Sequence, residues 1–296
     1  MAQNLKHAYL IIAHKNDFTF YTLLSMLDDR RNDIFIHMNK KNKDFSPSDV
    51  YAKIEKSNVY FIKRMSVTWG GYSQIKTEVR LLAAATKQGQ YAYYHLLSGE
   101  DLPIKSQDYI HKYLSNNVGT EYVGLSEAQE GFEERMGKYY FFQDKLGRRT
   151  GNMSFMQKIY SKLDGFSRAV QAKLKIKRNV GIHFAKGSNW FSITDGLARD
   201  VVSKRRFIKK TFKYTVCGDE EFLQTIVINS EKWREKAVGD QMRGALRLID
   251  WERGRPYIFR SEDYDLITKS DMLFARKFNA ETDKEIIEKV RDYVGQ

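Results

Sequence analysis

Two adjacent carboxylates, Glu100 and Asp101, follow an apolar run that ends in Gly99. Carboxylates in such a place can hold a divalent metal ion that neutralises a diphosphate. Neighbouring side chains at the end of a strand point to opposite faces, however, so this pair is poorly arranged to bind one ion. One carboxylate directed at ligand hydroxyls or at a cationic side chain, with the other turned into the structure, fits the spacing better. A surface turn with two solvated carboxylates is equally open.

A second acidic group stands in "CGDEEFLQT", where Asp219, Glu220 and Glu221 precede an apolar helical run. A carboxylate within reach of a hydroxyl can act as a general base. The helix dipole also favours acidic residues at a helix N-terminus, so a purely structural role is open. Spacing alone does not choose among the three carboxylates.

The stretch Trp69-Gly70-Gly71-Tyr72 is a glycine turn between aromatic residues, directly before a helical pattern. Two glycines let the backbone approach a ligand or another segment closely. Trp69 and Tyr72 could stack on a base or a sugar face. A packed corner of the core explains the same residues.

Strand-like and helical patterns alternate along the first ~125 residues and must position these groups. This alternation predicts an α/β fold with a mostly parallel sheet and helices on both faces. Ligands of such sheets bind at the carboxyl ends of the strands, which places His14, Asn39 and Glu100 along one edge. The strand-like runs are 7–15, 33–41, 58–64, 91–99 and 120–125, and the helical ones are 18–27, 47–56, 73–88 and 106–117.

The second half of the chain is less regular. We expect a strand with a turn at 183–194, a helix at 218–229, a loop-rich basic segment at 257–278 and a capped helix at 280–294. One domain, 1–296, with two lobes fits this pattern better than two separable domains. Residues 1–125 would form one half of the domain and residues 126–296 the other.

The net charge of +13 indicates polyanionic partners, such as phosphorylated ligands or an anionic membrane. No nucleic-acid-binding signature accompanies this charge, so nucleic acid is not an expected partner. No apolar run approaches the ~20 residues of a membrane span. The single cysteine, Cys217, excludes an internal disulfide framework. Together these features favour a cytoplasmic protein, with a peripheral place on the inner membrane face left open.

Much of the charge lies in the segment 145–178, which holds ten Lys/Arg and one Asp, a net +9. Apolar residues recur there at helical spacing, which predicts one apolar stripe along a helix. A helix packed on the domain is the favoured interpretation, and a helix lying on an anionic membrane is the alternative. The stripe consists of Phe155, Ile159, Leu163, Phe166, Val170 and Leu174.

Several segments together resemble the core-2/I-branching N-acetylglucosaminyltransferase family, which also contains the peptide O-xylosyltransferases. The resemblance implies a GT-A type nucleotide-sugar fold, an inverting mechanism and independence from metal ions. It also implies that residues 1–125 are the half that binds the nucleotide sugar and residues 126–296 the acceptor and catalytic half. The matching segments, in order, are "AYLIIAHK", "IFIHMNKK", "VTWGGYSQIKTE", "LLSGEDLPIKS", "KGSNWFSIT", "CGDEEFLQT" and "MLFARKF".

The same resemblance implies roles for individual residues. Glu220 falls on the catalytic base, and Lys277 on the lysine that binds the donor diphosphate. Arg255 matches the partner arginine, although Arg253 and Arg260 stay open because the local spacing differs by about a residue. The expected donor-binding set is His14, Asn39, Trp69, Asp101, Ser188, Arg255 and Lys277, and the expected acceptor-binding set is Trp190 and Glu100.

Asn39 departs from the family pattern, which has an Asp near the nucleotide at this position. The membrane anchors and disulfides of animal members are also absent, so the chain resembles a microbial member. We expect a glycosyltransferase that moves GlcNAc, xylose or another hexose from a UDP-sugar to a glycan or lipid-linked glycan, in cell-surface polysaccharide synthesis. No metal or other cofactor is expected. A metal-dependent transferase and a non-catalytic basic binding protein are the competing hypotheses.

Overall fold

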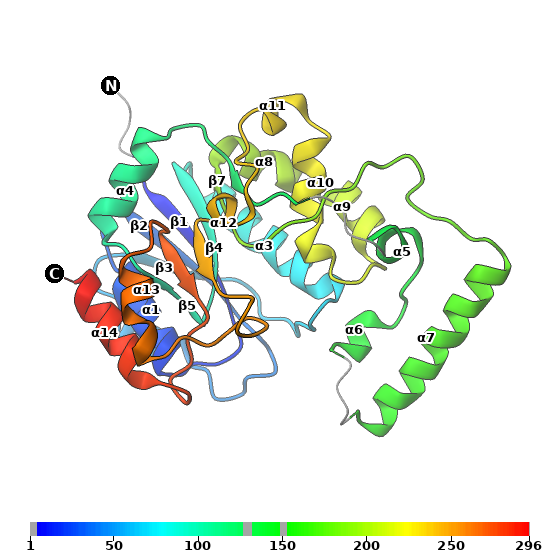
Figure 1. Ribbon diagram of the computed structural model, residues 1–296, viewed down its shortest axis with the longest axis horizontal. Helices are drawn as coiled ribbons and strands as arrows, with labels where there is room; N and C mark the ends of the chain where they lie inside the picture. Colours follow the sequence, from blue (N-terminus) through cyan, green and yellow to red (C-terminus); the bar gives the residue numbers. More distant parts are fainter. Residues whose placement is uncertain (1–4, 127–131, 149–152, 296) are drawn as a thin grey trace.

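A six-stranded sheet with the order β3-β2-β1-β4-β7-β6 forms the centre of the protein in the computed structural model, which describes residues 5–126, 132–148 and 153–295 (Figure 1). Strands β1 to β4 run parallel, β7 is antiparallel to β4, and β6 is antiparallel to β7. The predicted α/β fold with a mainly parallel sheet is therefore confirmed. The strands are β1 (His7–Ala13), β2 (Asn32–Met38), β3 (Asn58–Phe61), β4 (Tyr93–Ser98), β6 (Tyr122–Val123) and β7 (Phe191–Thr194).

Helices cover both faces of this sheet, because alternate side chains of β1 face two different hydrophobic clusters. Tyr9 and Ile11 belong to the cluster that includes α1 (Phe18–Leu27), α4 (Gln107–Asn116) and α14 (Lys284–Val294). Ala8 and Leu10 belong to the other cluster, formed with α3 (Tyr72–Gln88), α8 (Asp195–Ser203), α9 (Arg205–Phe212) and α10 (Phe222–Ile228). Figure 1 shows the two groups of helices on either side of the sheet.

A second sheet of three short strands adjoins the carboxyl end of β4. It contains β5 (Asp101–Pro103), β9 (Phe274–Arg276) and β8 (Arg247–Ile249), with β5 antiparallel to β9. In this register Asp101 lies opposite Arg276. The expectation of a loop-rich segment at 257–278 is wrong in part, because this stretch also contains η2 (Ser261–Asp263) and α13 (Tyr264–Thr268). Elements of three to five residues are too short to show a period in the sequence.

Several predicted bounds differ from the structure. The helix expected at 47–56 is the short α2 (Pro47–Tyr51), and the strand expected at 183–194 begins only at Phe191. The helix expected at 218–229 is divided into η1 (Gly218–Glu220) and α10, with Glu221 between them. The capped C-terminal helix is confirmed, since the Asp283 side chain accepts a hydrogen bond from the Ile286 N–H. The remaining helices are α5 (Phe132–Gly137), α6 (Gln143–Leu146), α7 (Phe155–Lys173), α11 (Glu231–Arg234) and α12 (Gln241–Ala245).

Helix α7 contradicts the favoured interpretation of the basic segment 145–178, of which residues 149–152 lie outside the described residues. Its apolar stripe does not pack on the domain: Phe155 is 77% exposed and Phe166 71% exposed. The buried side chains of the helix are the polar Asp164 and Gln171. In Figure 1 the helix lies at the edge of the molecule, apart from the two helical layers. No helix in the described ranges is long and apolar enough to cross a membrane.

Candidate active site

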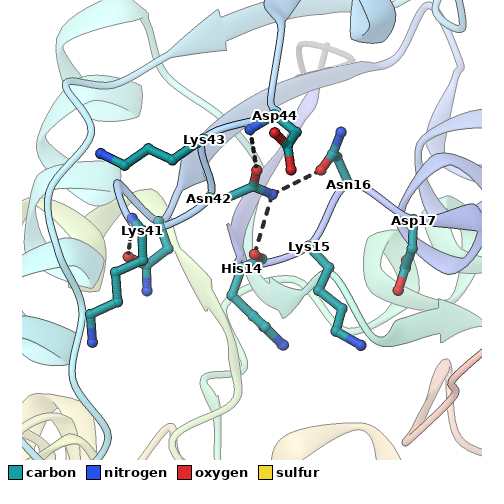
Figure 2. Close-up of a pocket in the computed structure, with 9 residues that line it drawn as sticks. His14, Lys15, Asn16, Asp17, Lys41, Asn42, Lys43 and Asp44 are labelled. Carbon is teal, nitrogen blue, oxygen red and sulfur yellow. Dashed lines mark hydrogen bonds between the residues drawn. The ribbon is translucent and has the colours of Figure 1, made fainter.

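A cleft of about 680 Å³ opens where β1 and β2 end, at the edge of the sheet that the sequence indicated (Figure 2). Asn42 joins the two strand ends, since its amide donates to the His14 carbonyl at 3.3 Å and to Asn16 Oδ1 at 2.8 Å. The structure thus brings His14 and Asn39 together, as expected. The cleft is lined by His14, Lys15, Asn16, Asp17, Asn39, Lys41, Asn42, Lys43 and Asp44.

Asn39, which departs from the family pattern, uses both ends of its amide. Its Oδ1 accepts from the Lys41 N–H at 3.1 Å, and its Nδ2 donates to the Val67 carbonyl at 3.2 Å. A carboxylate accepts hydrogen bonds but cannot donate one when ionised. The amide therefore joins the loop after β2 to the segment before α3 in a way that an ionised Asp could not.

Glu100 lies at the same edge and is paired with a lysine. Its Oε2 is 2.9 Å from Lys277 Nζ, and its Oε1 is 4.0 Å from His14 Nε2. The Glu100 carboxylate is largely buried, whereas the Lys277 side chain keeps some exposure. An ammonium group has three donors, so Lys277 can bind Glu100 and still donate to a second anion.

Asp101 faces away from Glu100 and has its own cationic partners. Arg276 Nη1 lies 2.6 Å from Asp101 Oδ1, and the fully buried Arg247 lies 3.8 Å from Oδ2 through its Nε. Asp101 also accepts hydrogen bonds from the main chain and side chain of Ser98. Burial lowers the pKa of Arg247 to about 10, because desolvation penalises the charged guanidinium. The expectation that the two carboxylates diverge is confirmed.

Trp190 connects this paired cluster to the segment before β7. The guanidinium carbon of Arg276 lies 4.6 Å from the centre of the Trp190 ring, and that of Arg247 lies 5.6 Å away. Trp190 is half-buried, whereas its neighbour Phe191 is the core residue of the pair. The Ser188 carbonyl accepts a hydrogen bond of 2.6 Å from Gln224, which ties this segment to α10.

The segment before β7 also contacts the acidic turn. The Gly187 N–H donates to the Glu220 carbonyl at 2.9 Å, and Lys186 Nζ lies 3.8 Å from Glu220 Oε2. A Cβ on residue 187 would lie 1.7 Å from the Gly124 carbonyl oxygen, so the close approach requires glycine here.

The three carboxylates of the turn have different environments. Glu220 is the exposed one, with 38% of its side chain accessible. Asp219 is buried, and desolvation together with the nearby Glu220 raises its pKa to about 7. Glu221 is fully buried, and desolvation raises its pKa to about 9. The buried Glu78 of α3 lies near Asp219, and burial raises its pKa well above the ordinary range. Glu220 is thus the carboxylate of the turn that a solvent-borne substrate can reach.

Trp69 stands on the other side of the acidic turn. The Gly70 carbonyl accepts a hydrogen bond of 2.9 Å from the Cys217 N–H, and Gly70 has a left-handed φ of +65°. Trp69 is 53% exposed and lines a cavity of about 410 Å³ with Arg135 and Arg148. Cys217 itself is buried.

The three candidate arginines for the donor diphosphate differ in their contacts. Arg253 is held by Asp250 and Asp263, at 2.5 and 2.6 Å. Arg255 is exposed, and the structure shows no contact between it and the other predicted donor residues. Arg260 follows Phe259, whose N–H donates to the Lys277 carbonyl at 2.9 Å. Main-chain pairing therefore brings the neighbour of Arg260 to Lys277.

Direct contacts and short stretches of main chain therefore join many of the predicted residues. His14 lies beside Glu100, Asp101 reaches Trp190 through Arg276, and Gly187, three residues before Trp190, binds the Glu220 carbonyl. Sequence reasoning missed Arg247, Arg276 and Lys186, although Arg276 directly precedes Lys277 in the quoted segment "MLFARKF". Among the residues that the structure describes, no group of three or more His, Cys, Asp or Glu could hold a metal ion.

Comparison with known proteins adds the family. The sequence model of the Core-2/I-Branching enzyme family matches residues 7–272. Mouse xyloside xylosyltransferase 1, in its apo form, is a similar solved structure at 9% identity, with 94% of this chain and 98% of that chain covered and a TM-score of 0.39. No curated protein sequence matches the chain. Because the family model spans most of the sequence, the chain belongs to the Core-2/I-branching family and is a glycosyltransferase.

Proposed function

We propose that the protein is an inverting glycosyltransferase that uses a UDP-sugar and needs no metal ion. The observation that supports this most directly is the pairing of both carboxylates at the sheet edge with basic side chains. Glu100 lies 2.9 Å from Lys277 and Asp101 lies 2.6 Å from Arg276. Paired carboxylates that point apart do not offer a shared metal site. Cations at this edge can instead neutralise a diphosphate.

In this proposal the donor lies along the cleft at the ends of β1 and β2. Its diphosphate is directed toward Lys277, which retains free N–H donors beside Glu100. Fixed cations stabilise the charge that develops on the leaving diphosphate, and they need no rearrangement during the reaction. The basic side chains of the cleft suit the same anionic ligand.

The chemical step is one displacement at the anomeric carbon. The acceptor hydroxyl forms the new C–O bond as the bond to the diphosphate breaks, and Glu220 takes the hydroxyl proton. UDP then leaves with the bonding electron pair. The exposure of the Glu220 side chain beside Lys186 supports this role, because a base must come within about 2.6–3.2 Å of the proton it removes.

The acceptor is proposed to be a glycan or a lipid-linked glycan, bound near Trp190 and Glu100. The sugar is GlcNAc, xylose or another hexose, and the pathway is cell-surface polysaccharide synthesis. A half-buried indole beside the paired carboxylates and arginines of the sheet edge offers an aromatic surface on which a sugar ring can stack. A peripheral place on an anionic membrane would bring a lipid-linked acceptor to this site.

A thermal-shift screen against UDP and UDP-sugars, with and without excess EDTA, tests this proposal, followed by transfer assays with the donor that binds. We expect stabilisation by a UDP-sugar and transfer that persists in EDTA. Loss of transfer in EDTA and its recovery on addition of Mn²⁺ would contradict metal independence and assign Glu100 and Asp101 to a metal site. No shift with any nucleotide sugar would contradict the donor class.

A further inference from the structure

Helix α7 turns its apolar side to solvent and its polar side to the protein. Phe155 and Phe166 are among its most exposed side chains, whereas Asp164 and Gln171 on the opposite side are buried. A helix that packs on its own domain shows the reverse arrangement. A contiguous exposed apolar surface of this kind is typical of a site that binds another protein or a membrane.

Lysines border this stripe on one side. At about 100° per residue, Lys158, Lys162 and Lys173 fall along one edge of the stripe. All three are exposed, and the exposed Lys175 and Lys177 follow the end of the helix. Long lysine side chains beside an apolar face can bury their stems while they keep the ammonium groups in the polar layer.

No acidic side chain offsets these lysines. Asp164 is the one acidic residue in the sequence between 153 and 180, and it is buried beside Arg168 at 3.2 Å. The exposed surface of the helix is therefore apolar and positive. Two copies of the chain would each bring a positively charged surface to such a contact, so self-association through this face is disfavoured.

We propose that α7 docks the protein on the surface of an anionic lipid bilayer. Its phenylalanines and Leu163 enter the boundary between headgroups and acyl chains, and its lysines bind anionic headgroups. Charge complementarity favours a bilayer, because the apolar stripe and the line of lysines run side by side along one helix. An anionic bilayer offers a negatively charged layer directly beside an apolar one. The proposal does not rest on the enzymatic activity, since docking requires no sugar donor.

Docking through α7 has a consequence for the active site. Arg168 lies on the side of the helix away from the stripe and lines the cavity that contains Trp69 and Arg148. Trp69 is next to Gly70, which binds the start of the acidic turn through Cys217. The helix thus stands between a bound membrane and a cavity lined by arginines and by Val216, three residues before the acidic turn. That order suits an acceptor held in the same membrane.

Vesicle sedimentation tests the proposal with the full-length protein. The vesicles contain phosphatidylcholine alone or phosphatidylcholine with phosphatidylglycerol. We expect binding to the anionic vesicles at low salt and release at high salt, because exposed charges are screened within about 8–10 Å at physiological ionic strength. Changing Lys158, Lys162 and Lys173 together to Glu should lower vesicle affinity by tenfold or more, since each lysine near an anionic surface contributes about a factor of five.

A second variant tests the apolar contact. Phe155→Ser with Phe166→Ser should also lower anionic-vesicle binding by tenfold or more, while the melting temperature stays unchanged because both side chains are exposed. The charge-matched control for the α7 lysine variant is Arg206→Glu with Lys209→Glu and Lys210→Glu on α9, three exposed cations whose replacement should leave most of the binding intact.

Three results would overturn the proposal. The wild-type protein could fail to sediment with anionic vesicles even at low salt. The α9 control could lose as much binding as the α7 lysine variant, which would reduce the effect to net charge. Sedimentation velocity could show a dimer that the Phe155/Phe166 variant abolishes, which would make a second copy the occupant.

Discussion

Lys277 Nζ lies 2.9 Å from the Glu100 carboxylate, at the edge of the sheet where the parallel strands β1 and β4 end. The pair places a cation, held by a largely buried acid, beside the cleft of His14 and Asn39. An ammonium group held in this way can still donate hydrogen bonds to a second anion. Because the lysine side chain is already ordered, binding that anion costs less conformational entropy. The pair therefore makes Lys277 a preorganised cation, as the proposed binding of the donor diphosphate requires.

Lys277→Met should weaken UDP binding about 10- to 150-fold, equivalent to about 1.5–3 kcal/mol for a hydrogen bond to a charged group. Isothermal titration calorimetry with UDP measures this directly. Because Met leaves the Glu100 carboxylate without its partner, the double variant with Glu100→Gln is needed and should show the same loss. Lys112→Met, at the opposite edge of the sheet, is the control. Wild-type affinity in both Lys277 variants would remove Lys277 from the donor site.

The sequence predicted the parallel sheet and its ligand-binding edge because β1, β2 and β4 are apolar runs buried on both faces. It could not predict the second sheet, where strands of three residues show no period. Nor could it choose among Asp219, Glu220 and Glu221. Their burial depends on tertiary contacts with α3 and the segment before β7, which adjacent sequence positions do not reveal.

The favoured interpretation of α7 failed for a related reason. Helical spacing of apolar residues predicts a stripe but not what the stripe faces. Buried Gln171 bonds to the main chain of Tyr139, and Gln157 donates to the Leu146 carbonyl, so polar contacts hold the helix on the protein. The 3.6-residue period of the apolar residues is the same whether a helix packs on its domain through polar or through apolar side chains.

Gly187→Ala should destabilise the protein and lower transfer. Its Cβ would lie 1.7 Å from the Gly124 carbonyl oxygen, a main-chain atom that cannot rotate away. Overpacking of this kind typically costs 1–3 kcal/mol, and here it would also displace the Gly187 N–H that binds the Glu220 carbonyl. Urea unfolding and a transfer assay measure the two effects. Gly239→Ala, where a Cβ meets nothing within 4 Å, is the matched control. Equal behaviour of the two variants would contradict the close approach.

Three histidines that lie together, His7 of β1, His95 of β4 and His111 of α4, should make the protein less stable in acid. The His7 ring stacks on His111 with centres 3.9 Å apart, and His95 Nε2 lies 3.2 Å from His7 Nδ1. Burial, with the positive Arg31 nearby, lowers the pKa of His111 to about 4, and burial lowers the pKa values of His7 and His95 well below 6.5.

The unfolded chain therefore binds protons before the folded one does as the pH falls. The unfolding free energy should be highest above pH 6.5 and should decrease between about pH 6.5 and 4. Urea titrations at several pH values measure this slope. His111→Gln should make it shallower, whereas the exposed His183→Gln should leave it unchanged. An unchanged pH dependence of the unfolding free energy in His111→Gln would show that another group causes the loss of stability in acid.

Glu221 should give the opposite dependence on pH. Burial raises its pKa from 4.5 to about 9, so the folded protein holds a proton that the unfolded chain has lost. This group's contribution is present below pH 4.5 and is lost as the pH rises toward 9. Glu221→Gln cannot ionise. The free energy of unfolding of this variant should therefore exceed that of wild type by on the order of 1–3 kcal/mol at pH 8 and by almost nothing at pH 4.5. A difference that does not change with pH would contradict the buried neutral acid.

Glu220→Gln should lower sugar transfer by roughly 10²–10⁴-fold, the usual contribution of general acid–base catalysis. The amide keeps the shape of the side chain but cannot take a proton, so donor affinity should stay close to wild type. Initial rates at saturating donor, together with calorimetric UDP binding, separate the two effects.

Asp219→Asn and Glu221→Gln are the matched controls, because they change adjacent but buried carboxylates. Both should transfer sugar at rates within about tenfold of wild type, since burial raises their pKa values and keeps them from the acceptor. If one of them is the inactive variant while Glu220→Gln transfers normally, the base is misassigned within the turn. If all three transfer normally, the turn contributes only structure, and the base must lie elsewhere on the edge formed by Glu100, Trp190 and Lys277.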